Sequence, residues 1–116
     1  MNKAKQDQLS ALIAELSEEM MRDSERWFGE SGTVRDFRFL ALALCGEAGE
    51  YANVVKKIWR GSADPKSPAV RTQLAGEQTD ILIYLLLGAH VQGMDLIKCY
   101  YNNVRPANEK RFGNAK

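Results

Sequence analysis

The chain has few of the residues from which most transition-metal and redox sites are built. It contains one histidine, His90, and two isolated cysteines, Cys45 and Cys99. Zinc sites need clustered His and Cys ligands, and di-iron helical bundles need Glu-x-x-His pairs, so the sequence argues against both kinds of site. The separated thiols instead predict reduced cysteines that pack in the core of a cytoplasmic protein.

A charge excess of either sign and a long apolar run are also absent. The formal net charge is +1, which argues against a general nucleic-acid binder, because such a protein needs a clustered basic surface. The nearly apolar run of residues 81–94 is too short to cross a bilayer. The first residues have no long apolar core and no small-residue cleavage site, so we expect no secretory signal. We therefore expect a cytoplasmic protein that has neither a membrane nor a nucleic-acid polymer as its partner.

Proline is scarce, and helical periodicity is present instead of a strand pattern. Apolar residues recur at three- and four-residue steps in four segments, at about residues 9–27, 35–60, 68–93 and 95–105. Ser67 and Pro68 are typical of a helix start, Asp95 is a candidate N-cap, and Pro106 should end or kink the last helix near Arg105. The 116 residues suffice for one domain. The sequence thus predicts a single all-α domain, residues 1–116, with a four-helix bundle-like fold.

The third helical segment is apolar around its whole circumference. Its stretch "ILIYLLLGAHVQGM" has no polar stripe that would face water. Three other helices in so short a chain would enclose it poorly, so we expect a second copy of the chain to cover part of it. The sequence therefore predicts a homo-oligomer, either a homodimer or a homotetramer.

Four acidic residues stand on the apolar sides of two consecutive helices. Glu47 and Glu50 are three residues apart, and Glu77 and Asp80 repeat this spacing. Both pairs are equally distant in sequence from the centre of the polar loop "GSADPKSP", so an antiparallel hairpin would bring them to the same height. Unpaired carboxylates in such a position are unfavourable without a cation nearby. Three glycines beside them would leave room for a ligand to approach: Gly46, Gly49 and Gly76.

The chemistry of these side chains predicts the kind of cation. Four converging carboxylates without His or Cys favour a hard ion, Mg²⁺ first and Mn²⁺ as the alternative. Mg²⁺ usually keeps water ligands and binds substrate phosphates. The sequence therefore predicts a site for Mg²⁺ or Mn²⁺.

The pattern "GEAGE" followed by "GEQTDILIY" resembles the Glu-x-x-Glu and Glu-x-x-Asp signature of the MazG-like all-α nucleoside triphosphate pyrophosphohydrolases. The similarity extends from about Phe39 to Phe112. It implies a MazG-type oligomer in which a helical hairpin holds the site and hydrolyses a (d)NTP to the (d)NMP and pyrophosphate. By this resemblance the four acids are metal ligands, and Glu47 or Glu50 also orients or deprotonates the attacking water.

The resemblance also implies residues that contact the substrate. Tyr84, one turn after Asp80, corresponds to an aromatic residue near the base or sugar, although a core tyrosine would have the same spacing. Asn108 and Arg111 match the last two members of a Lys, Asn, Arg phosphate-binding set. The lysine of that set is missing, and Arg105 is the candidate substitute.

Two other functions remain open at the level of sequence. One is phosphoribosyl-ATP pyrophosphohydrolysis, the same chemistry on another substrate. The other is a non-catalytic helical protein that binds nucleotide or a protein partner through the same acids. The main interpretation is an enzyme that removes unwanted deoxynucleotides from the nucleotide pool.

Overall fold

The computed structural model describes residues 1–29 and 32–113, and within these ranges its regular secondary structure is helical, with no strand. Its elements are α1 (Lys3–Phe28), a 3₁₀ turn η1 (Thr33–Arg35), α2 (Phe37–Trp59), α3 (Pro68–Val91), α4 (Leu96–Cys99), a π-helical turn η2 (Tyr100–Val104) and α5 (Arg105–Phe112). The prediction of an all-α fold is confirmed.

The helix boundaries follow from local capping chemistry. Asp36 caps α2 by accepting a hydrogen bond from the backbone N–H of Arg38 at 2.9 Å. Pro68 occupies the first turn of α3. Backbone N–H groups in that turn have no intrahelical acceptor, so the missing N–H of proline costs no hydrogen bond there. Asp95 caps α4 through the backbone N–H of Lys98 at 2.9 Å. These starts agree with those predicted from the sequence.

The sequence predicted that Pro106 ends or kinks the last helix near Arg105, and of these two alternatives the end of the helix is wrong. Helical residues continue through Pro106 to Phe112, and the irregularity lies before the proline, in the π-helical turn η2. The N–H of Arg105 donates to the carbonyl of Tyr100, five residues earlier. A proline normally clashes with the carbonyl four residues before it, and the wider π-helical turn changes the backbone there, so the chain can stay helical.

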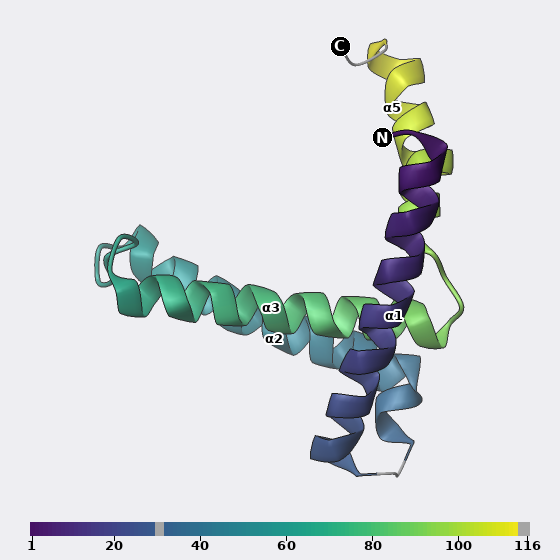
Figure 1. Cartoon of the computed structure of the whole chain (residues 1–116). Coiled ribbons are helices and arrows are strands. Elements are labelled where there is room, and N and C mark those ends of the chain that lie inside the picture. The colour runs from purple at the N-terminus through teal and green to yellow at the C-terminus, as the bar shows by residue number, and fades with distance from the viewer. Residues whose placement is uncertain (30–31, 114–116) are drawn as a thin grey trace.

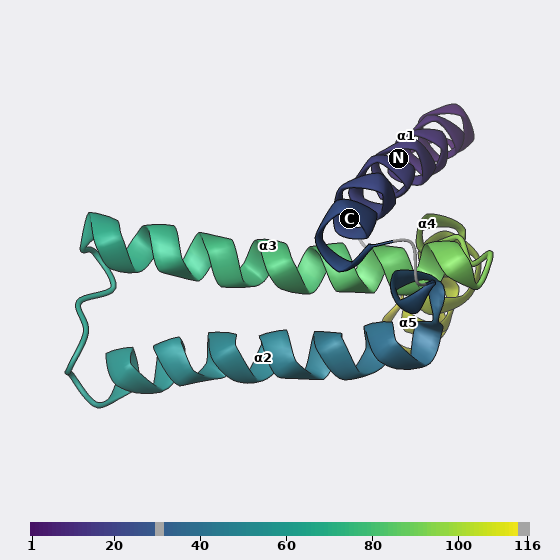
Figure 2. The same cartoon turned by 90° about the horizontal axis from the view of Figure 1, so that it is seen from below.

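The molecule has two limbs that meet at a junction. One limb is the antiparallel hairpin of α2 and α3, and the other, the C-terminal limb, is the run of α4, η2 and α5. Helix α1 crosses near the end of α3 and contacts α4 (Figures 1 and 2). The radius of gyration is 17.2 Å, whereas a compact domain of this length has one of about 13 Å. The four helical segments are therefore not packed along their whole lengths within one chain.

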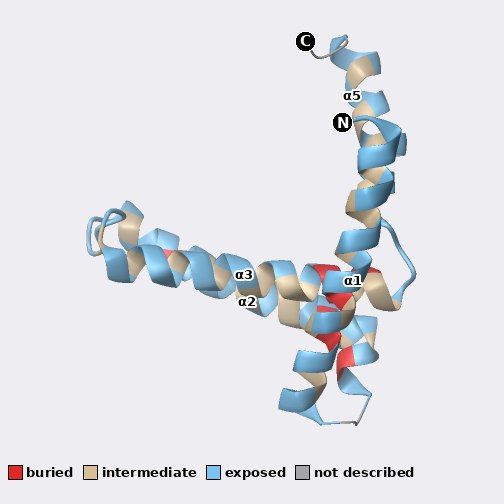
Figure 3. Ribbon diagram, in the orientation of Figure 1, coloured by how far each residue is buried: buried red, intermediate tan, exposed pale blue. Residues whose placement is uncertain are grey.

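The buried core lies where the two limbs meet (Figure 3). Its fully buried members are Met21 of α1, Val34 of η1, Leu40 of α2 and Leu87 of α3. Each helix contributes to this core over only a short part of its length. The core therefore fixes the angle between the limbs and leaves the hairpin to project from the junction.

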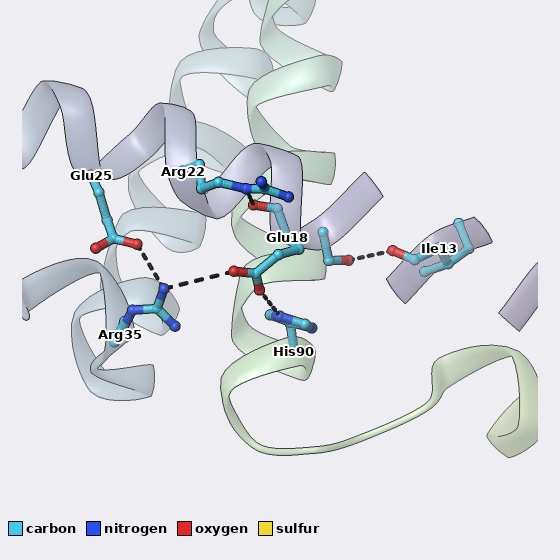
Figure 4. Close-up of polar contacts among 7 residues, drawn as sticks. Ile13, Glu18, Arg22, Glu25, Arg35 and His90 are labelled. Carbon is cyan, nitrogen blue, oxygen red and sulfur yellow. Dashed lines mark hydrogen bonds and ion pairs between the residues drawn. The ribbon is translucent and has the colours of Figure 1, made fainter. Parts of the chain in front are cut away.

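A polar network fastens α1 across the end of α3 (Figure 4). The Nε2 atom of His90 lies 2.7 Å from Oε2 of Glu18, and this hydrogen bond is the main cause that lowers the pKa of the Glu18 carboxyl. Arg35 pairs with Glu25 at 2.7 Å beside it. The single histidine therefore has a structural role at the junction.

Both cysteines are exposed, so the expectation that they pack in the core is wrong. The buried positions of α2, Leu40 and Val54, are separated by fourteen residues and lie on one face. Cys45 falls off that face. Cys99 lies on α4, where its sulfur accepts a long hydrogen bond of 3.7 Å from Asn103.

Apolar side chains remain exposed along α3. Leu82 is 43% exposed and Leu85 is 44% exposed. Among the described residues, no single helix has the length and apolar character needed to cross a bilayer. Only α3 taken together with Leu96–Phe112 meets those criteria, and that pair is bent by 92°.

Candidate metal centre

The acidic residues of the sequence motif meet across the α2–α3 hairpin. One carboxylate oxygen from each of Glu47, Glu77 and Asp80 lies within 4.8 Å of the others. Glu47 comes from α2, and the other two come from the facing turns of α3. The antiparallel geometry of the two helices (Figure 2) thus brings side chains thirty residues apart into one cluster.

Glu50 lies at the edge of this three-residue cluster. Glu50 is exposed, whereas Glu47, Glu77 and Asp80 are half-buried. It is nonetheless close enough to raise the pKa values of both Glu47 and Glu77. The structure therefore separates the four acids into three that share one small volume and one, Glu50, that is exposed beside them.

Burial and mutual repulsion oppose ionisation of the clustered acids. Burial is the largest cause that raises the pKa of Glu47, followed by Glu50 and then by the charges of Asp80 and Glu77. For Glu77 burial again comes first, followed by the charges of Glu50 and Asp80. Among the described residues, no lysine or arginine forms an ion pair with any of the four.

Two oxygens at this place are buried without a hydrogen-bond partner, Oε2 of Glu47 and Oε2 of Glu77. Such atoms are rare in folded proteins, because leaving a buried polar atom unpaired costs about 1–3 kcal/mol. A divalent cation would satisfy both oxygens and reverse the repulsion. An all-oxygen donor set fits Mg²⁺ or Mn²⁺.

The glycines beside the acids have no packing role within the chain. A Cβ atom built on Gly46, Gly49 or Gly76 would meet nothing within 4 Å. These positions lie inside regular helices, where glycine is unfavourable by about 1 kcal/mol relative to alanine. The chain itself therefore does not fill the space beside these glycines. The hypothesis that a ligand approaches the acids there requires such open space.

Tyr84 joins the acidic cluster to the core. It is half-buried and packs against the core residues. Burial raises the pKa of its hydroxyl, and the charges of Glu47 and Asp80 raise it further. Its predicted position, one turn beyond Asp80 on the same face, is the position observed.

A mainly apolar cleft of about 200 Å³ adjoins Tyr84 at the base of the hairpin. Its walls include Phe37 and Leu44 of α2 and Leu85 and Gly88 of α3. No feature of the sequence had predicted this cleft. The available signal was Gly88, which stands one turn after Tyr84 and whose missing side chain leaves open space.

Asn108 and Arg111 do not lie beside the acids of their own chain. Both are exposed on α5, which continues the helical run of η2 and lies on the other limb, away from α2 and α3 (Figure 1). Arg105, the candidate substitute for the missing lysine, pairs with Glu109 at 3.1 Å. The structure therefore gathers the acids and Tyr84, and it leaves the predicted phosphate-binding residues apart from them.

Comparison of the chain with protein-family models, with curated proteins and with solved structures finds no match in any of the three. The likeness to MazG-like enzymes therefore rests on the acidic motif and on the residues around it. The geometry of the acidic cluster bears on function independently of this motif.

Proposed function

We propose that the protein is a Mg²⁺-dependent nucleoside triphosphate pyrophosphohydrolase of the MazG-like kind, which converts a (d)NTP and water to the (d)NMP and pyrophosphate. The observation that supports this most is the pair of unpartnered buried oxygens, on Glu47 and Glu77, inside a cluster of three carboxylates. The motif resemblance supplies the class of reaction.

Glu47, Glu77 and Asp80 are the residues that would hold the ion. Their oxygens already lie close together, so little rearrangement of the two helices is needed to bind it. When bound, Mg²⁺ supplies positive charge to the phosphate oxygens and lowers the pKa of a coordinated water. The ion also relieves the repulsion that opposes ionisation of Glu47 and Glu77.

Glu50 is the best candidate to orient the attacking water and to accept its proton. Its side chain is exposed at the edge of the cluster, where a substrate would approach. General-base catalysis of this kind contributes about 10²- to 10⁴-fold to a rate. Tyr84 and the apolar cleft beside it would receive the base or sugar, because a cleft with apolar walls and one hydroxyl suits a flat ring.

A substrate panel tests the proposal. The protein is incubated with Mg²⁺ and, separately, with each common NTP, each dNTP and phosphoribosyl-ATP, and pyrophosphate release is measured. Release from (d)NTPs is expected, and release from phosphoribosyl-ATP alone would assign the protein to that reaction. If nucleotides bind tightly and none is hydrolysed, the non-catalytic function is correct.

Matched variants connect any activity to the site. Glu50→Gln and Asp80→Asn should each lower kcat by about 100-fold or more, since each removes a carboxylate that acts on water or metal. Glu19→Gln, which changes an exposed acid on α1, should leave kcat unchanged. Near-normal rates for either site variant, in folded protein, would remove that residue from the mechanism.

A further inference from the structure

The single histidine of the chain lies where α1 crosses the end of α3 (Figure 4). Its Nε2 atom is 2.7 Å from Oε2 of Glu18, which stands 72 positions earlier in the chain. Within the part of the chain that the structure describes, no other side-chain hydrogen bond joins α1 to α3. Imidazole is the side chain whose charge ordinarily changes between about pH 5 and pH 8. The link between these two helices therefore depends on a kind of group whose charge responds to pH.

Protons from solvent have access to this contact. The side chain of His90 is 29% exposed and that of Glu18 is 41% exposed. The imidazole also lines a partly enclosed cavity of about 80 Å³ between α1, α3 and the start of α4, and Ser10 and Asp95 are further polar residues of its lining. Such a cavity is large and polar enough to hold water. The ring can therefore change its charge while the junction stays closed.

Charged groups of both signs face the contact from the elements that surround it. On α1, in η1 and at the start of α4 these groups are Glu18 itself, Arg22, Glu25, Arg35 and Asp95. Asp36 and Arg38, at the start of α2, pair with each other at 2.8 Å. Arg35 is 3.9 Å from Glu18 but 2.7 Å from Glu25, so its closer partner is Glu25. Glu18 therefore keeps the imidazole as its closest partner.

Glu18 keeps its negative charge over the range in which imidazoles titrate. The pKa of its carboxyl is lowered from 4.5, first by the hydrogen bond with His90 and then, against the effect of burial, by the charges of His90, Arg35 and Arg22. A carboxylate can only accept hydrogen bonds, so Nε2 of His90 carries a proton whether the ring is neutral or charged. Protonation of the other ring nitrogen therefore keeps the hydrogen bond and adds a positive charge to its donor. The contact then becomes an ion pair as well, and its attraction increases.

The contact lies beside the core that fixes the angle between the limbs. Met21, one turn after Glu18 on α1, is fully buried in this core. Leu87, one turn before His90 on α3, is fully buried there as well. The polar contact and the buried side chains therefore hold the same crossing of the two helices. A stronger contact should oppose local opening of α1, because α1 cannot leave the crossing without breaking it.

We propose that His90 and Glu18 form a pH-sensitive clamp, in which protonation of the imidazole tightens the attachment of α1 to the end of α3 and deprotonation loosens it. The clamp should tighten as pH falls from about 8 to about 6, the range in which imidazole side chains gain a proton. It should weaken again only below pH 4.5, as the carboxyl of Glu18 becomes protonated. The rigidity of the junction thus depends on pH. The clamp acts at the junction and does not depend on the proposed hydrolysis.

Amide hydrogen exchange of the whole chain tests the clamp. The exchange rate expected for an unfolded chain, divided by the rate observed at the same pH, gives a protection factor that reports local opening. For the amides of α1 near the crossing, residues 13–22, we expect protection factors about two- to fivefold greater at pH 6 than at pH 8. The change is modest because both side chains are partly exposed.

Two variants remove the change in charge and keep the hydrogen bond. His90→Gln has an N–H donor that never becomes charged, and Glu18→Gln has an acceptor that is always neutral. In each variant, protection of residues 13–22 relative to wild type should be about two- to fivefold lower at pH 6 than at pH 8. Comparison with wild type at each pH cancels the titration of Glu47 and Glu77, which all of these proteins share. Glu19→Gln, which changes the exposed acid next to Glu18, is the matched control and should behave like wild type.

The ring itself supplies an independent readout, because one histidine gives one Hε1 resonance in the NMR spectrum. This resonance should move between pH 8 and pH 6 in the folded wild-type protein as the ring gains its charge. A resonance that stays fixed would overturn the clamp, and so would a pH dependence of protection that His90→Gln retains in full. If His90→Gln does not fold, Glu18→Gln decides by the same comparison.

Discussion

The carboxyl groups of Glu47 and Glu77 are the residues whose environment departs most from that of ordinary surface acids. Each has one buried oxygen with no hydrogen-bond partner, and each has a raised pKa. Burial disfavours the charged form, and the neighbouring carboxylates add repulsion. Both side chains therefore destabilise the metal-free fold at neutral pH and become stabilising only when a cation joins them.

Neutralising these acids should stabilise the metal-free protein. Glu47→Gln and Glu77→Gln are each expected to raise the metal-free Tm by several degrees at pH 7.5 and to abolish most of the Mg²⁺-induced rise in Tm. Thermal melts with and without Mg²⁺ measure both effects. The exposed Glu19→Gln variant should behave like wild type. A metal-free Tm that falls in both site variants would show that the fold does not oppose ionisation of the Glu47 and Glu77 carboxyl groups.

Gly49 lies next to Glu50 in a helix where nothing of the chain would touch an added methyl group. Gly49→Ala should therefore stabilise the chain by about 1 kcal/mol through helix propensity. Because the methyl group would enter the space beside the acids, we expect kcat/KM for the nucleotide to fall about tenfold or more. Denaturant unfolding and steady-state kinetics measure the two changes.

The reverse change at the neighbouring exposed position, Ala48→Gly, is the control. It should destabilise by about 1 kcal/mol and leave kcat/KM unaltered. Unchanged activity of Gly49→Ala would mean that the space beside the acids is not used by a ligand.

At the scale of elements, the burial of α1 changes along its length. Met21 is fully buried in the junction core, whereas Leu12, nine residues earlier on the same helix, is 54% exposed. The hydrogen bond between Glu18 and His90 lies near the buried point. The N-terminal half of α1 is therefore more exposed, and its Ser10 hydroxyl donates to Oδ1 of Asp95 at the start of α4 at 3.1 Å.

Substitutions on α1 should separate these two environments. Met21→Ala is expected to cost about 2–5 kcal/mol of unfolding free energy, because it leaves a cavity in the core. Leu12→Ala should cost less than about 1 kcal/mol in the single chain. Chemical denaturation of dilute protein gives both values. A large loss for Leu12→Ala under those conditions would contradict the two-limbed single chain.

At the scale of the whole molecule, two sets of carboxyls give stability a predictable dependence on pH. The pKa values of Glu18 and Asp95 are lowered, and that of Asp36 is lowered to about 2 by its bonds to Arg38. Their stabilisation is complete above their ordinary values of 4.5 and 3.8, and it is lost as pH falls through the folded values.

Glu47 and Glu77 act in the opposite direction. Their folded pKa values lie above the ordinary 4.5, so they have no effect well below pH 4.5 and destabilise increasingly as pH rises through the folded values. Metal-free protein should therefore be most stable near about pH 4.5. Mg²⁺ should move this maximum toward neutral pH.

Melts from about pH 3 to pH 8, with and without Mg²⁺, check this dependence. The double variant Glu47→Gln/Glu77→Gln is the control and should lose the decline above about pH 4.5. A metal-free stability that rises steadily from pH 4.5 to neutral pH would contradict the raised pKa values.

The helices and the meeting of the acids could be predicted from the amino-acid sequence. Helical periodicity, Pro68 and Asp95 marked the starts of α3 and α4, and the equal distances of the two acid pairs from the loop placed them opposite each other. Those signals are local, or they depend on a single short turn. The continuation of the last helix through Pro106 was not predicted, because a π-helical turn depends on backbone hydrogen bonds that no residue pattern indicates.

Periodicity, capping residues and one antiparallel turn thus determined an all-helical chain whose acids converge on α2 and α3, since each of these features depends on neighbours along the chain. Tertiary structure alone decided that α5 lies away from those acids, that both cysteines are exposed and that an apolar cleft opens beside Tyr84. The direction of one limb relative to another depends on how Met21, Val34, Leu40 and Leu87 pack at the junction. These residues are far apart in the chain, and their contacts produce no regular pattern in the sequence. The contacts therefore could not be predicted from spacing.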